Sequence, residues 1–185
     1  MCKSKLTFIT IAGLLLAFTG QAQDTNTLKT VIQVFEAQTD TVVIKGFKLV
    51  GSVSAAAGKV SVLAKESTGT ANRVKLYGMA VVFDSNQQRE MAVIDYNELD
   101  SLIAGIDYLA KITSDASSMS GFEAGITTKS GFRVIAFSSQ RKGAIQYFLQ
   151  FSGGQRISLL PEQLTQFENL VSQAKASLDS LRSGK

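Results

Sequence analysis

The sequence predicts an α+β fold of two tandem ββββα units, with antiparallel sheet covered by two helices. Four strand-like segments precede an apolar helical stripe in the first half, and the same order recurs in the second half. The helix starts near Glu98 and Glu162 lie about 65 residues apart. We expect one domain over 41–185, built from halves at 41–113 and 121–183. The alternative is an unrepeated α+β domain whose strands happen to group in this way.

The first half contains four predicted strands. The first is rich in Val, and Gly46 and Gly51 within it favour a bulge. The third is apolar on both faces near its end, which is typical of a central strand. The four predicted strands cover 41–54, 59–65, 73–83 and 89–95, and a polar loop around Gly69 covers 66–72.

An amphipathic helix is predicted over 99–113. Its apolar residues recur every three or four positions, so they share one face. Asp95 and Glu98 have the spacing of a capping box, with Asp in place of Ser or Thr. A small, Ser-rich connector follows at 114–121. The apolar stripe consists of Leu99, Leu102, Ile103, Ile106, Leu109 and Ala110.

The second half repeats the pattern. Residues 144–152 show the cleanest period-two alternation of the chain, and Gly153 and Gly154 form a hairpin turn. Pro161 stands where a first helical residue is favoured, so a helix should run from there to about Arg182. The four predicted strands cover 122–128, 132–139, 144–152 and 155–160.

The last helix carries a narrow apolar stripe with strict 3-4-3-4-3 spacing. Such a stripe is typical of a coiled-coil seam. We favour a core helix that lies on its own domain. The alternative is a homodimer in which this helix pairs with a second copy. The stripe consists of Leu164, Phe167, Val171, Ala174, Leu178 and Leu181.

The N-terminus predicts a cleaved signal peptide at 1–22. Lys3 and Lys5 precede an apolar run at 6–18, and small residues at 19–22 offer a cleavage site. The run has about 13 residues, fewer than the ~20 of a transmembrane helix, so no transmembrane segment is predicted. We therefore expect a secreted or periplasmic protein.

The segment 23–40 follows, and its helical spacing predicts a short leading helix around Leu28, Val31, Ile32 and Phe35.

Composition excludes several reaction classes. The chain has no histidine, and its only cysteine is Cys2, inside the predicted signal peptide. Ser-His-Asp catalysis, thiol chemistry and the common zinc ligand sets are therefore excluded. Loss of Lys3 and Lys5 leaves 17 basic and 15 acidic residues, a formal charge of +2, which gives no reason to expect nucleic acid. The sequence predicts no enzyme activity, no cofactor, no metal site and no catalytic residues.

One acidic group has the composition of a cation-binding or catalytic site. It consists of Asp95, Glu98, Asp100 and Asp107. Its spacing lacks the pattern of a calcium loop, and acidic residues in a first helical turn are favoured by the helix dipole. We interpret the group as helix capping and solubility.

The Gly-containing segments 66–72 and 152–155 lack the Lys of a phosphate loop. Four tyrosines, Tyr77, Tyr96, Tyr108 and Tyr147, are interpreted as half-buried packing residues.

Three segments carry a resemblance. The stretch from Ile94 to Tyr108, together with Phe35 to Thr39 and Ile44 to Phe47, resembles small secreted bacterial proteins of unassigned function. The two four-strand-plus-helix units resemble the Whirly, Pur-alpha and PC4-like single-strand nucleic-acid binders, and Ile157 to Leu164 is similar to the strand-to-helix entry of PC4-like domains.

That second likeness is one of fold, and fold does not fix function. The chain departs from those binders because it carries an export signal and lacks a concentrated basic, aromatic sheet face. The function expected is therefore an exported, non-catalytic binding or structural domain for a protein or small ligand. The alternative is a single-stranded nucleic-acid-binding module of Whirly or Pur-alpha topology.

Overall fold

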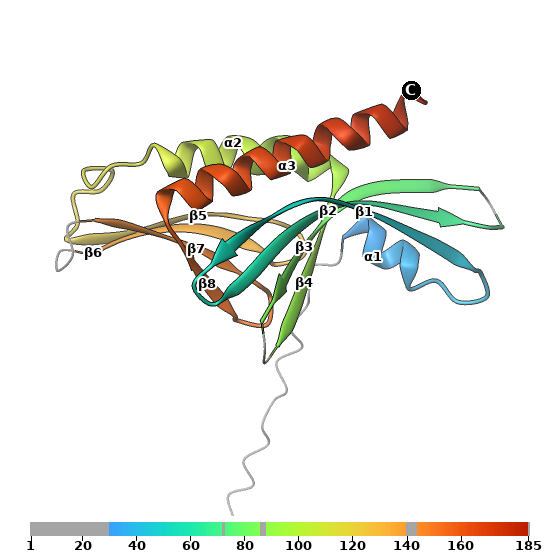
Figure 1. Cartoon of the computed structure of the whole chain (residues 1–185), viewed down its shortest axis with the longest axis horizontal. Coiled ribbons are helices and arrows are strands. Elements are labelled where there is room, and N and C mark those ends of the chain that lie inside the picture. The colour runs from blue at the N-terminus through green and yellow to red at the C-terminus, as the bar shows by residue number, and fades with distance from the viewer. Residues whose placement is uncertain (1–29, 72, 86–87, 140–143, 185) are drawn as a thin grey trace, which may run out of the picture.

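The computed structural model describes residues 30–71, 73–85, 88–139 and 144–184, and it confirms the α+β class (Figure 1). Two four-stranded antiparallel sheets each run in simple sequence order. Sheet A consists of β1 (Val43–Ala55), β2 (Gly58–Gly69), β3 (Lys75–Asp84) and β4 (Arg89–Asp95). Sheet B consists of β5 (Gly121–Thr127), β6 (Arg133–Ser139), β7 (Ile145–Gln150) and β8 (Arg156–Leu159). The helices are α1 (Val31–Glu36), the 3-10 turn η1 (Tyr96–Glu98), α2 (Leu99–Ala110) and α3 (Pro161–Arg182).

The β1–β2 hairpin is longer than expected. Residues 66–69, predicted as part of a polar loop, continue β2, because Val43 pairs with Gly69 across the hairpin. The polar residues there alternate along a strand, so their polarity reflects position and not a loop. The predicted bulge is confirmed, since the β1–β2 register shifts between Leu49 and Gly51.

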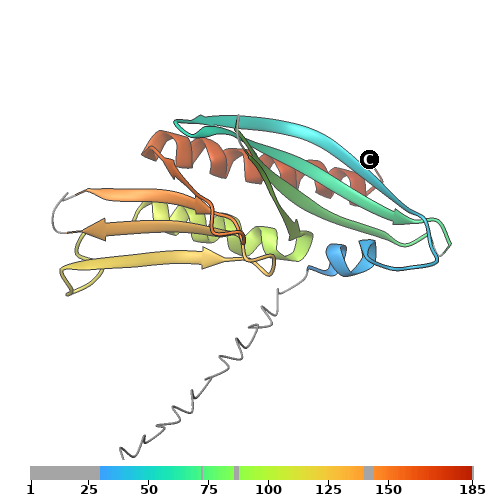
Figure 2. The ribbon, with the colours of Figure 1, turned by 90° about the horizontal axis from the view of Figure 1, so that it is seen from below.

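Each of the two long helices packs on the sheet of the other half, an exchange that we call the crossed arrangement. Helix α2 follows sheet A in sequence but lies against β5 and β6 of sheet B, whereas α3 follows sheet B and lies against β1, β2 and β3 of sheet A (Figure 2). Glycines allow the closest approaches. A Cβ on Gly105 of α2 would lie 2.5 Å from Ile126 Cδ1, and a Cβ on Gly51 of β1 would lie 2.5 Å from Leu170 Cδ2. Each half therefore buries the sheet of the other.

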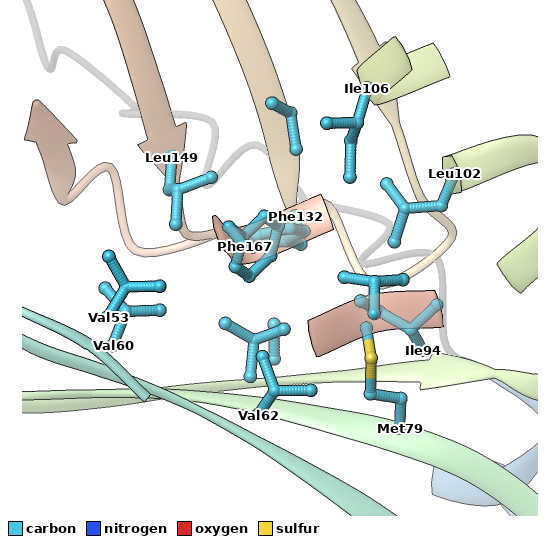
Figure 3. Packing of buried hydrophobic residues seen from close by; sticks show 14 of the residues in the cluster. Val53, Val60, Val62, Met79, Ile94, Leu102, Ile106, Phe132, Leu149 and Phe167 are labelled. Atoms are coloured by element: carbon cyan, nitrogen blue, oxygen red, sulfur yellow. The ribbon is translucent and has the colours of Figure 1, made fainter. Parts of the chain in front are cut away.

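One hydrophobic core joins both sheets and both helices (Figure 3). Four aromatic rings bridge it from sheet A to α3. The ring of Phe83 lies 6.4 Å from that of Phe151, which packs edge-on at 5.3 Å against Phe132. Phe132 in turn lies 6.2 Å from Phe167 of α3. These separations suit tilted and edge-to-face aromatic packing.

The predicted stripe of α3 is used inside the molecule. Its first five residues are fully buried against the molecule's own core, while Leu181 is 47% exposed. A homodimer through this helix would therefore have to use the opposite face.

Among the described residues, no helix is long and apolar enough to cross a membrane. The predicted signal peptide at 1–22 lies outside the described residues.

The expected short leading helix is present as α1. It packs on β3 and β4 of sheet A. The Thr30 side chain accepts the backbone N–H of Gln33 at 3.1 Å, and Thr30 and Gln33 complete a capping box. The buried carboxylate of Asp95 accepts the backbone N–H groups of Val31 at 2.7 Å and Ile32 at 3.1 Å. A side chain from the end of β4 thus fixes the first turn of a helix over 60 residues earlier.

Candidate binding surfaces

The outer face of sheet A, opposite α3, carries an apolar row that crosses all four strands. Leu49, Leu63, Ala80 and Val93 lie in register from β1 to β4. On the same face Leu49 is 62% exposed, and its neighbours Phe47 and Met91 are 49% and 55% exposed. The row itself sinks into the molecule toward β4, because Ala80 and Val93 are buried, as is Val82 beside them. We call the exposed part of this face the sheet A patch; it consists of Phe47, Leu49, Leu63 and Met91.

Next to the patch, α1 is attached to the same face by a buried ion pair. Lys65 of β2, whose side chain is 1% exposed, lies 2.7 Å from Glu36 at the end of α1. Lys45 lies 3.0 Å from the other Glu36 oxygen, and the Ser67 hydroxyl donates to Glu36 at 2.5 Å. The Lys65 ammonium also lies 4.3 Å above the ring of Phe47, a cation–π contact. Both ends of α1 are therefore held by charged side chains of sheet A.

These contacts shift the ionisation of Glu36. Burial by itself would raise the pKa of the Glu36 carboxyl, but hydrogen bonds from Lys65, Ser67 and Lys45 outweigh it and hold the pKa below its usual value. Glu36 is thus charged at neutral pH and balances Lys65. The sequence analysis missed this pair. The sequence feature that could have predicted a buried ion pair is Lys65, a lysine that lies between Leu63 and Ser67 on one face of a strand.

The outer face of sheet B combines aromatic and basic side chains. Phe137 of β6 is 38% exposed, and its cross-strand neighbours place Phe148 on the same face. Arg133 and Arg156 lie on this face too, but Glu123 pairs with both, at 2.8 Å and 3.7 Å. Sequence reasoning found no such face, because its members come from separate strands and meet only through the register of sheet B.

The acidic residues Asp95, Glu98, Asp100 and Asp107 do not form a common cation or catalytic site, because each is engaged separately or exposed. Asp95 binds the first turn of α1, and Glu98 accepts the N–H of Asp95 at 3.2 Å in the predicted capping box. The second Glu98 oxygen accepts the N–H of Lys129 at 2.7 Å, which ties α2 to the β5–β6 turn. Asp100 is 81% exposed at its side chain, and Asp107 pairs with Lys111 at 2.6 Å. Among the described residues, no cluster of potential metal-ligating side chains is found.

The predicted turns and tyrosines have structural roles. Gly154 forms the β7–β8 turn with a left-handed φ of 87°. Tyr147 is buried on the inner face of sheet B, and burial raises the pKa of its hydroxyl. Tyr108 is 65% exposed, so the prediction that it is a half-buried packing residue is wrong. Tyr77 and Tyr96 are partly buried and line one wall of a pocket beside α1.

No family model, curated protein or solved structure matches the chain. Two outer sheet faces carry exposed side chains, apolar ones on sheet A beside α1 and mixed aromatic and basic ones on sheet B.

Proposed function

We propose that this protein is a non-catalytic binding protein that works outside the cytoplasm and holds a protein partner against the sheet A patch. The observation that carries the proposal is the exposure of Phe47, Leu49 and Met91 on one face of sheet A, where the apolar row continues into the buried Ala80 and Val93. Monomeric soluble proteins rarely expose contiguous apolar patches larger than a few hundred Å², and patches above that size mark interaction sites. Export is inferred from Lys3, Lys5 and the apolar run at 6–18.

The rim of the patch indicates the chemistry of the partner. Lys59, Asp84 and Arg89 lie in register at the end of the same face, so this end has one net positive charge. A partner with an apolar centre and an acidic edge would match both features. A catalytic role has no support, because the chain has no histidine and the weighed carboxylates are engaged separately.

The test places a photo-crosslinking amino acid at position 49 in the producing cell, and at position 160 as a matched control. Leu160 is also apolar and 60% exposed, but it lies outside sheet A, after β8. We expect one protein to be captured at position 49 and not at 160. The purified partner should then bind the Leu49→Lys variant at least about tenfold more weakly than the unaltered chain. The same products at both positions, or a product made of two copies of this chain, would contradict the proposal.

The outer face of sheet B supports a second candidate, binding of single-stranded nucleic acid. Phe137 and Phe148 could stack on bases while Arg133 and Arg156 contact phosphates. Glu123 lowers the net positive charge of this face, which makes the candidate weaker. Titration with a labelled single-stranded oligonucleotide at low and high salt distinguishes the two. Salt-sensitive binding that Arg133→Gln and Arg156→Gln together abolish would favour this second function.

A further inference from the structure

A pocket of about 220 Å³ opens at the edge of sheet A, away from the sheet A patch. It forms because β4 stops at Asp95, opposite Gly78, while β3 continues to Lys75. The first three residues of β3 therefore have a β2 neighbour on one side and no β4 neighbour on the other. Figures 1 and 2 place α1 and the C-terminal end of α3 at this same end of the molecule.

The walls of the pocket are mainly apolar and aromatic. They come from four elements, α1, β3, η1 and α3, so the pocket exists only in the folded chain. Ile32 is fully buried beneath it, and Leu76, Tyr77 and Tyr96 are partly buried. The apolar and aromatic part of the wall includes Ile32, Leu76, Tyr77 and Tyr96, and the charged lining residues are Lys75, Asp95 and Arg182.

Arg182 is the charged group that remains available to a ligand. Its guanidinium carbon lies 3.9 Å from the centre of the Tyr96 ring. Among the described residues, no carboxylate lies within 4 Å of it, whereas Lys75 is paired with Glu66 at 3.2 Å. Stacking on the ring holds the guanidinium plane and leaves its N–H groups free to donate.

The acidic groups close to the pocket are already engaged. Asp95 accepts two backbone N–H groups from the first turn of α1. Asp179 accepts the hydroxyl of Tyr96 and lies 3.2 Å from Lys175. The pocket thus offers mainly apolar walls and, at its mouth, a guanidinium with no carboxylate within 4 Å among the described residues, although the nearby Asp179 interacts with it electrostatically. Apolar walls with one available cation suit an anion with an apolar body.

We propose that this pocket binds a small organic monocarboxylate, with its apolar body against Tyr77 and Leu76 and its carboxylate on Arg182. A planar guanidinium pairs with a carboxylate through two parallel hydrogen bonds. The volume is below the roughly 300–1,000 Å³ of pockets for drug-sized ligands, so the ligand is compact. A ligand of about ten non-hydrogen atoms bound at such a site has an expected Kd of about 1 mM. The site is independent of the function proposed for the sheet A patch.

The experiment is an amide NMR titration of the full chain with phenylacetate, and with 2-phenylethanol as the uncharged analogue. We expect saturable shifts at Leu76, Tyr77 and Asn97 with phenylacetate, and binding about tenfold weaker with the alcohol. Arg182→Gln should weaken phenylacetate binding by a similar factor. Arg156→Gln, a matched exposed arginine on sheet B, should leave it unchanged.

Three outcomes would overturn the proposal. These are the absence of saturable shifts at the pocket, equal affinity for acid and alcohol, and equal loss in the two arginine variants. Arg182 is exposed at the last turn of α3, so its substitution is expected to leave the fold intact. The comparison of acid with alcohol needs no variant and decides the matter even if Arg182→Gln were unstable.

Discussion

At the scale of single residues, the buried pair of Lys65 and Glu36 is the feature with the clearest energetic consequence. A lysine that is 1% exposed at its side chain is tolerated only with a charged partner, because an unpaired buried ammonium is costly to desolvate. Glu36 is that partner, and it comes from α1. The position of α1 on sheet A is therefore tied to the charge balance of β2.

We expect Glu36→Gln to lower the free energy of unfolding by about 3 kcal/mol, since it leaves Lys65 buried without its counter-charge. The matched control is Glu66→Gln, which breaks the more exposed pair with Lys75. That control should change the free energy by at most ~1 kcal/mol. Urea unfolding followed by circular dichroism measures both. Equal losses in the two variants would show that the Lys65 pair is not buried as described.

The same pair predicts a dependence on pH. Folding lowers the pKa of Glu36, while in the unfolded chain this pKa is about 4.3. The unfolded state therefore binds the proton first as pH falls, and stability drops as pH passes down through the folded-state pKa. We expect the stability difference between the unaltered chain and Glu36→Gln to be full at pH 6–7, above ~4.3, and to shrink below it. If the free energies of unfolding of the two proteins changed in parallel from pH 7 to pH 3, this prediction would be contradicted.

At the scale of elements, the crossed packing of α2 and α3 depends on close approach at glycines. Leucine at position 105 would place its Cβ 2.5 Å from Ile126 Cδ1 and 3.0 Å from Ile126 Cβ, so β5 or α2 must shift. We expect Gly105→Leu to destabilise the fold by about 1–3 kcal/mol. Ala104→Leu, on the exposed face of the same helix, should stay within ~0.5 kcal/mol. Equal thermal stability of the two variants would contradict the packing of α2 on β5.

Local elements were predicted well from the sequence because their signals are local. Alternation in 144–152 and the position of Pro161 located β7 and the start of α3. The capping box predicted from the spacing of Asp95 and Glu98 is confirmed. By contrast, residues 66–69 were misassigned, since a polar strand end and a polar loop have the same composition.

Contacts between distant segments were not predictable in this way. Nothing in the apolar stripe of α3 tells which sheet it will cover, because any sufficiently apolar face would satisfy it. The Lys65 pair and the Arg182 pocket likewise join residues that are far apart in the chain. Only the folded arrangement brings such groups together.

At the scale of the whole molecule, the crossed helices make the two halves depend on each other. Sheet A is covered by α3 from the second half, and sheet B by α2 from the first. Removing either half would expose the inner face of the remaining sheet, including fully buried residues such as Val62 or Leu149. We therefore expect the chain to unfold as one cooperative unit.

Native-state hydrogen exchange of the full chain tests this interdependence most directly. It measures an opening free energy for each backbone amide. If the halves are interlocked, the slowest amides of β2 and β3 and those of β6 and β7 should share one opening free energy, equal to that of global unfolding. A lower opening free energy throughout one sheet, while the other stays protected, would show that the halves fold independently and would contradict the crossed arrangement.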